Sequence, residues 1–96
     1  MTFPEIINTY LDILDCTASE LAKESGITSA SLSRYRNGQR VPETDTLKKI
    51  SDGISKIAGR RELTDIGYDS IYEKFIDELG VVETDNSQFS GNFANL

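Results

Sequence analysis

Three arginines, Arg34, Arg36 and Arg40, stand within seven residues of a chain that is acidic overall, with 16 Asp and Glu against 10 Lys and Arg. The stretch around them, residues 25–42, contains no carboxylate. A guanidinium group stays charged at any physiological pH, and its fork of donors matches both phosphate oxygens and the acceptor edge of guanine. Arginines gathered in an acid-free window therefore indicate a surface that binds a polyanion.

The charge of the remaining segments sharpens this contrast. Residues 43–61 carry five bases and three acids, whereas residues 62–96 carry eight acids and one base, and residues 1–24 carry five acids and one base. A basic centre is thus flanked by two acidic segments. Because charge also varies along a chain by chance, composition only suggests a polyanion site, and the spacing of the side chains has to decide.

Catalytic and metal-binding chemistry have little support. The chain has no histidine and one cysteine, Cys16, so a nucleophile triad of the usual kind, a zinc site and an internal disulfide are not expected. The carboxylates are scattered, and Cys16 reads as a buried core residue rather than a redox sensor. We expect no enzyme and no cofactor. The N-terminus lacks the features of a signal peptide and no apolar run could span a membrane, so we expect a cytoplasmic protein.

The arginines fall on the second of two short predicted helices. Thr17 and Glu20 form a capping box that starts the first of them, and Gly26 can take the left-handed conformation that ends it. Thr28 then caps a helix that runs over about residues 29–37, up to Gly38. Two helices separated by about three residues across a glycine turn are typical of a helix-turn-helix.

Three further helices are expected around this pair. Capping signals place one from the Thr2–Glu5 capping box to near Asp15, one from residue 43 or 44 to Gly59, and one from near Asp69 to Gly80. Their apolar residues recur at three- and four-residue steps, which predicts one buried seam on each helix. We therefore predict an all-α domain of five helices over residues 1–80, followed by a tail or linker at 81–96.

The outward face of the helix at 29–37 carries side chains that suit a DNA groove. On a helical wheel Leu32 and Tyr35 turn toward the core, with Thr28 on their side. The outward and flanking positions are Ser29, Ala30, Ser33, Arg34, Arg36 and Asn37. The major groove admits one α-helix, and short side chains let its backbone approach the base edges. A carboxylate on this face would repel DNA phosphates, which explains why residues 25–42 contain no Asp or Glu.

Four of these positions can read bases. Ser29 and Ser33 can donate or accept a hydrogen bond, and Ala30 can meet a thymine methyl group. Arg34 can grip guanine O6 and N7 with both arms of its guanidinium, a contact that discriminates between bases by about 1–3 kcal/mol.

Other positions suit the phosphate backbone. Thr28 and the free N–H groups at the start of the helix can meet a phosphate. Arg36, Asn37 and Arg40 are better placed for phosphates that set register and affinity. The competing interpretation is a solvated helix whose outward face happens to be basic. The capped helix and the tight glycine turn before it favour DNA contact.

The stretch TASELAKESGITSASLSRYRNGQRVP, residues 17–42, resembles the helix-turn-helix of the lambda-repressor-like (Cro/C1, XRE-type) DNA-binding family. The similarity is clear over about residues 17–57. Its matching positions are Leu21, Ala22, Gly26, Ile27, Leu32, Ser33, Gly38, Pro42 and Leu47. The resemblance implies a compact five-helix domain that commonly binds operator DNA as a dimer. It implies phosphate contacts for Thr28, Ser33 and Asn37, and base-reading positions at Ser29, Ala30 and Arg34.

Two residues depart from the family's pattern. Ala18 stands where the family often has a glutamine that supports the base-reading side chain, which leaves the sequence preference open. Arg36 stands where a glutamate usually pairs with a base in the first helix. The first helix here has no base, so we expect that ion pair to be lost and Arg36 to be free to turn to DNA.

These observations predict sequence-specific binding of double-stranded DNA by a transcriptional regulator or its DNA-binding domain. The alternative is a protein–protein module, such as an antitoxin or an adaptor, because the acidic flanks favour some partner. A protein partner or a further domain could also follow the tail. A homodimer through the fifth helix is expected, since that helix has apolar residues on more than one side. Those residues are Ile71, Tyr72, Phe75, Ile76 and Leu79.

Overall fold

The first helix begins at the predicted capping box. In the computed structural model of the protein, which describes residues 2–80, α1 spans Phe3–Leu14. The Thr2 hydroxyl accepts a hydrogen bond from the Glu5 N–H at 3.3 Å, and the Glu5 carboxylate accepts one from the Thr2 N–H at 2.7 Å. The bond from the Thr2 backbone lowers the pKa of Glu5. Asp15 ends the helix in the left-handed conformation.

The helix-turn-helix follows as expected. Helix α2 spans Ala18–Ser25, and the Thr17 hydroxyl caps it by accepting a bond from the Glu20 N–H at 3.1 Å. Gly26, with φ of +73°, ends α2. Helix α3 spans Ser29–Arg36, with Thr28 as its N-cap and Asn37 at its C-terminal end. Only residues 26–28 separate the two helices, and the turn that the sequence predicted is confirmed.

The last two helices also agree with the sequence to within a residue or two. Helix α4 spans Thr44–Arg60, and its N-cap, Glu43, makes no side-chain capping bond. Helix α5 spans Tyr68–Leu79 and ends at Gly80, which has φ of +68°. Within residues 2–80 there are five helices and no strand, so the predicted all-α fold is confirmed.

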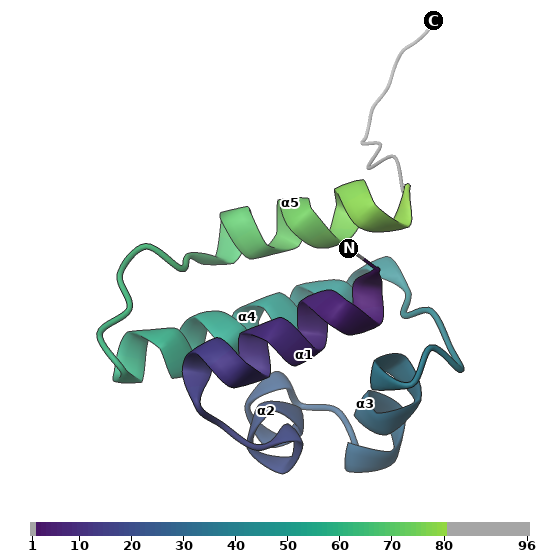
Figure 1. Ribbon diagram of the computed structural model, residues 1–96, viewed down its shortest axis with the longest axis horizontal. Coiled ribbons are helices and arrows are strands. Elements are labelled where there is room, and N and C mark those ends of the chain that lie inside the picture. Colours follow the sequence, from purple (N-terminus) through teal and green to yellow (C-terminus); the bar gives the residue numbers. More distant parts are fainter. Residues whose placement is uncertain (1, 81–96) are drawn as a thin grey trace, which may run out of the picture.

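The five helices enclose one core. Figure 1 shows α5 on one side of α1 and α4, and α2 and α3 on the other. The predicted seams of α1 and α4 are buried. Phe75 of α5 packs against α1, with its ring centroid 5.1 Å from that of Phe3 and 6.4 Å from that of Tyr10. On α5 only Ile71 and Phe75 are fully buried. Three further residues of α5, Tyr72, Ile76 and Leu79, are half-buried against the same core.

Helices α2 and α4 approach each other closely at Gly53. A Cβ atom added at Gly53 would collide with the Ser25 hydroxyl and lie 3.0 Å from the Ser25 backbone nitrogen. Ser25 is itself buried, and its hydroxyl has no hydrogen-bond partner among the described residues. No local sequence signal distinguishes Gly53. Its function is steric, because it lets α2, the first helix of the helix-turn-helix, lie against α4.

The predicted tail, residues 81–96, lies outside the described residues. The division into a domain at 1–80 and a tail at 81–96 therefore stays a prediction. None of the helices among the described residues is long and apolar enough to cross a membrane.

Candidate nucleic-acid interface

Two buried side chains set the rotation of α3. Leu32 is 0% exposed and Tyr35 is 6% exposed, and both belong to the core cluster. Packing these residues turns the opposite side of α3 to solvent. The exposed positions on and beside that side are Ser29, Ala30, Ser33, Arg34 and Asn37, and the N-cap residue Thr28 is exposed as well. All the base-reading positions that the sequence analysis named are therefore accessible, and Tyr35 packs in the core as expected.

The start of α3 leaves backbone donors available. The Thr28 hydroxyl accepts a bond from the Ser31 N–H and donates one to the Ser31 hydroxyl, each at 3.0 Å. The first N–H groups of a helix have no intrahelical partner, and Thr28 satisfies only the one on Ser31. The N–H groups of Ser29 and Ala30 remain as donors at the positive end of the helix dipole, where an anion is favoured. The Thr28 hydroxyl would have to leave Ser31 to donate to a phosphate.

The other end of α3 presents two free guanidinium groups. Arg34 and Arg40 are exposed, and neither forms an ion pair within residues 2–80. Gly38, with φ of +74°, turns the chain between them, so Arg40 lies in the loop that follows the helix. No carboxylate stands on α3 or in the turn before it, and the nearest acid along the chain after Arg40 is Glu43.

Arg36 is not free of α1, and the expectation that it would be is wrong. Its side chain is half-buried, and its Nε donates a hydrogen bond to Oδ1 of Asn8 on α1 at 2.8 Å. The prediction considered only a missing ion pair. An amide oxygen can accept from a guanidinium as a carboxylate does, so the loss of a charged partner did not release the arginine.

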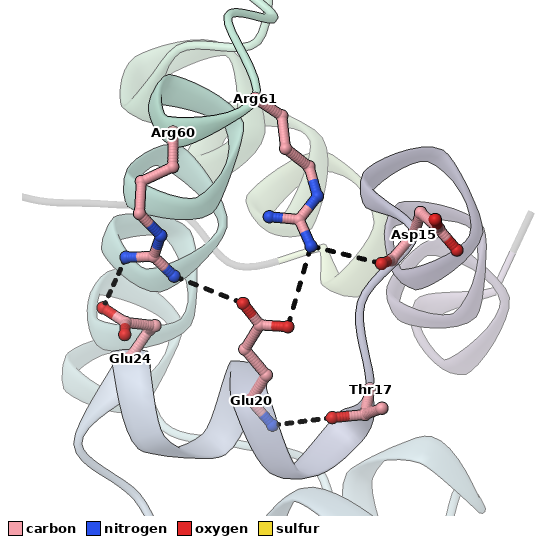
Figure 2. Close-up of polar contacts among 6 residues, drawn as sticks. All are labelled: Asp15, Thr17, Glu20, Glu24, Arg60 and Arg61. Atoms are coloured by element: carbon pink, nitrogen blue, oxygen red, sulfur yellow. Dashed lines mark hydrogen bonds and ion pairs between the residues drawn. The ribbon is translucent and has the colours of Figure 1, made fainter.

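Helix α2 is held by a cluster of ion pairs at the C-terminal end of α4 (Figure 2). Arg60 lies 3.3 Å from the Glu20 carboxylate and 3.2 Å from that of Glu24. Arg61 lies 3.8 Å from Glu20 and donates to the backbone oxygen of Asp15 at 3.2 Å. The expected second bond of the capping box, in which the Thr17 N–H donates to the Glu20 carboxylate, is absent from this cap, and the carboxylate points to the two arginines instead.

These ion pairs change how the basic centre is distributed. Arg60 and Arg61 neutralise acids of α2, and Lys56 pairs with Asp52 one turn away at 3.0 Å. At least three of the five bases in residues 43–61 therefore form ion pairs within the protein. On α3 and in the loop after it, the exposed positive charge comes from Arg34 and Arg40.

Cys16 is half-buried against the core rather than fully buried as expected. Burial, followed by the nearby Glu20 carboxylate, raises the pKa of its thiol, so the reactive thiolate is disfavoured. Within the described part of the chain there is no group of three or more His, Cys, Asp or Glu side chains that could hold a metal ion.

Residues 9–55 match a protein-family model described as helix-turn-helix. The match runs from the second half of α1 through α2 and α3 into α4, so it includes the exposed face of α3 and the elements that support it. No curated protein and no solved structure matches the chain.

Proposed function

Because residues 9–55 of the chain belong to the lambda-repressor-like (XRE-type) helix-turn-helix family of DNA-binding domains, we propose that the protein is a transcriptional regulator that binds double-stranded DNA sequence-specifically. The observation that carries the proposal is the exposed, acid-free face of α3, which the buried Leu32 and Tyr35 turn to solvent. In this proposal α3 enters the major groove as the recognition helix.

Three side chains read the bases in this proposal. Arg34 is the main reader, with its guanidinium on guanine O6 and N7. Ser29 and Ala30 stand at the first two positions of α3, where they approach base edges most closely and where a hydroxyl and a methyl group can each discriminate. Short side chains at these positions let the helix backbone come near the floor of the groove.

The remaining contacts hold the phosphate backbone. We assign Ser33, Asn37 and Arg40 to phosphates flanking the groove, together with Thr28 and the free N–H groups beside it. These contacts release condensed counterions, so binding should weaken steeply as the salt concentration rises.

A duplex selected from a random pool at fixed salt would give the target, and three variants would then test the assignment. Arg34→Ala should weaken binding to the selected duplex by about 5- to 150-fold and relax the preference at one base pair. Arg40→Ala should weaken binding to all duplexes and reduce the salt slope by about 0.9. Lys56→Ala is the matched control, because that lysine pairs with Asp52 on α4.

The result that would overturn the proposal is specific. If Arg34→Ala and Arg40→Ala bind DNA as the wild type does, α3 is not the recognition helix. If no duplex is enriched from the pool, sequence-specific binding itself is ruled out.

A protein-binding function is the second candidate, and a groove between α1 and α5 favours it. The groove has a volume of about 410 Å³ and an apolar floor of Ile6, Tyr10 and Ile13, of which Ile13 is 51% exposed. Acids of α5 stand at its edge, among them Asp77 and Glu78. This function would be established instead if the protein formed a stable complex with a protein partner at physiological salt and bound no DNA duplex under the same conditions.

Dimerisation through α5 also stays a proposal. Tyr72, Ile76 and Leu79 contact the protein's own core but keep part of their surface exposed, so they offer a modest apolar patch to a second copy. Two half-sites about one helical turn apart in the selected duplex would support a dimer. Sedimentation that shows only monomer at high concentration, with and without DNA, would exclude it.

A further inference from the structure

The bond between Arg36 and Asn8 attaches the end of α3 to the middle of α1. The donor is the Nε of Arg36, the last residue of α3, and the acceptor Oδ1 belongs to a residue 28 positions earlier in the chain. Among the described residues, no other side-chain hydrogen bond joins α3 to another helix. Both side chains are half-buried, so the bond is partly protected from competition with water.

This bond supplies something that the apolar contacts of α3 do not. Leu32 and Tyr35 bury the helix, but apolar packing is not directional and tolerates small rotations. A helix of eight residues is about 12 Å long, so a tilt of about 5° moves its far end by about 1 Å. Side chains that bind a partner must be held to within about 0.5 Å. The turn at Gly26 fixes the start of α3, and the Arg36–Asn8 bond fixes its end.

We propose that Asn8 and Arg36 form a positioning pair that sets the orientation of the recognition helix. In this assignment Asn8 determines DNA affinity and sequence preference although it lies on α1, and Arg36 acts through Asn8 instead of as an independent phosphate clamp. The inference rests on the proposed function, since it concerns how α3 meets the groove.

The two roles for Arg36 predict opposite results for a change at Asn8. Asn8→Ala removes the acceptor and leaves the charge of Arg36 in place. A positioning pair then loses affinity for the selected duplex by about tenfold, as expected for a hydrogen bond to a charged group, while the salt slope stays that of the wild type. A phosphate clamp would be unaffected by Asn8→Ala, or bind better once released from α1.

Variants at Arg36 complete the test. Arg36→Lys keeps the positive charge but removes the Nε donor, so a positioning pair is weakened by about the same factor as in Asn8→Ala, and the double variant is no worse than either single variant. Asn8→Asp keeps an acceptor for the Arg36 Nε. This variant should therefore discriminate between the selected duplex and a single-mismatch duplex as the wild type does. Thr9→Ala is the control on α1, because Thr9 lines the groove toward α5.

The discrimination ratio separates positioning from mere stability. Binding would be measured well below the melting temperature of each variant, with the active fraction determined by titration. A loss of folded protein would lower the active fraction but leave the ratio between matched and mismatched duplexes unchanged. A displaced recognition helix would lower that ratio.

Nuclear magnetic resonance of the DNA-free protein gives an independent readout. Asn8→Ala should shift the backbone amide signals of α3 and speed the exchange of the Arg36 Nε proton with water. If neither changes, or if Asn8→Ala binds and discriminates as the wild type does, the inference is overturned while the proposed function stands. If the wild type enriches no duplex at all, the proposed function fails and the inference fails with it.

Discussion

The face formed by α3 and the face formed by α1 and α5 carry opposite charge on one small scaffold. Helix α3 has two arginines and no acid, whereas α5 has four acids and one lysine and α1 has two acids and no base. Figure 1 places α5 and α3 on opposite sides of α1 and α4. The net charge of the whole chain, −6, therefore hides a basic face and an acidic face. A protein that repels DNA on one side and attracts it on the other meets the duplex in one orientation.

The largest expected effect comes from reversing one charge on each face. Arg34→Glu places an acid on the acid-free face of α3 and removes the proposed base contact, so affinity for the selected duplex should fall by about 100-fold or more. Lys74→Glu makes the same charge change on α5 and should alter affinity by about threefold or less, because the intervening protein and salt separate it from DNA. Fluorescence anisotropy at fixed salt measures both. Equal losses would mean that only net charge matters.

The scaffold that both faces share should be most sensitive at Gly53. Gly53→Ala inserts a methyl group where the Ser25 side chain and backbone already lie, and should destabilise the fold by about 2 kcal/mol through overpacking. Ser25→Ala removes a buried hydroxyl that lacks a partner, and should leave stability unchanged or slightly raised. Urea unfolding measures both changes. A Gly53→Ala protein as stable as the wild type would show that α2 and α4 are less tightly packed than described.

The arginines at the end of α4 should behave differently from those of the α3 face. Arg60 is about half exposed, so Arg60→Ala should lower the free energy of unfolding only slightly, and less at high salt. Because Arg60 pairs with acids of α2, its removal should leave the salt slope of DNA binding unchanged. A slope reduced by about 0.9 would instead show that Arg60 contacts a phosphate and that the DNA-binding surface extends to this end of α4.

The smallest effect is expected at Glu5 on the acidic side. Hydrogen bonding to Thr2 lowers its pKa in the folded protein, so it stabilises the fold above the pKa of the unfolded chain and this contribution is lost as the pH falls through the folded value. Glu5→Gln removes the ionisable group. The difference in Tm between wild type and Glu5→Gln should be constant near neutral pH and shrink below about pH 4.3. A difference that grows on acidification would contradict the described cap.

The sequence contained the signals for most of the fold because those signals are local. The caps at Thr2, Thr17 and Thr28 act over three residues, and the glycine ends and apolar seams act over one or two turns. The same signals predicted which residues of α3 face outward, since burying Leu32 and Tyr35 turns the opposite side of the helix to solvent.

The contacts that sequence reasoning missed join residues far apart in the chain. Asn8 and Arg36 are 28 positions apart, and Glu20 and Arg60 are 40 apart. No spacing rule links such residues, and each alone reads as an ordinary surface side chain. The same holds for Gly53, whose neighbour Ser25 lies on another helix. Locating these partners requires the helices to be packed first.

The most direct test of the central claim is a map of amide chemical-shift changes as the selected duplex is added to the ¹⁵N-labelled protein. We predict that the changes concentrate at residues 28–40, on α3 and the turns that flank it, and that α5 and the outer side of α1 stay nearly unchanged. Changes concentrated along the groove between α1 and α5, with α3 unaffected, would contradict the assignment of α3 as the recognition helix.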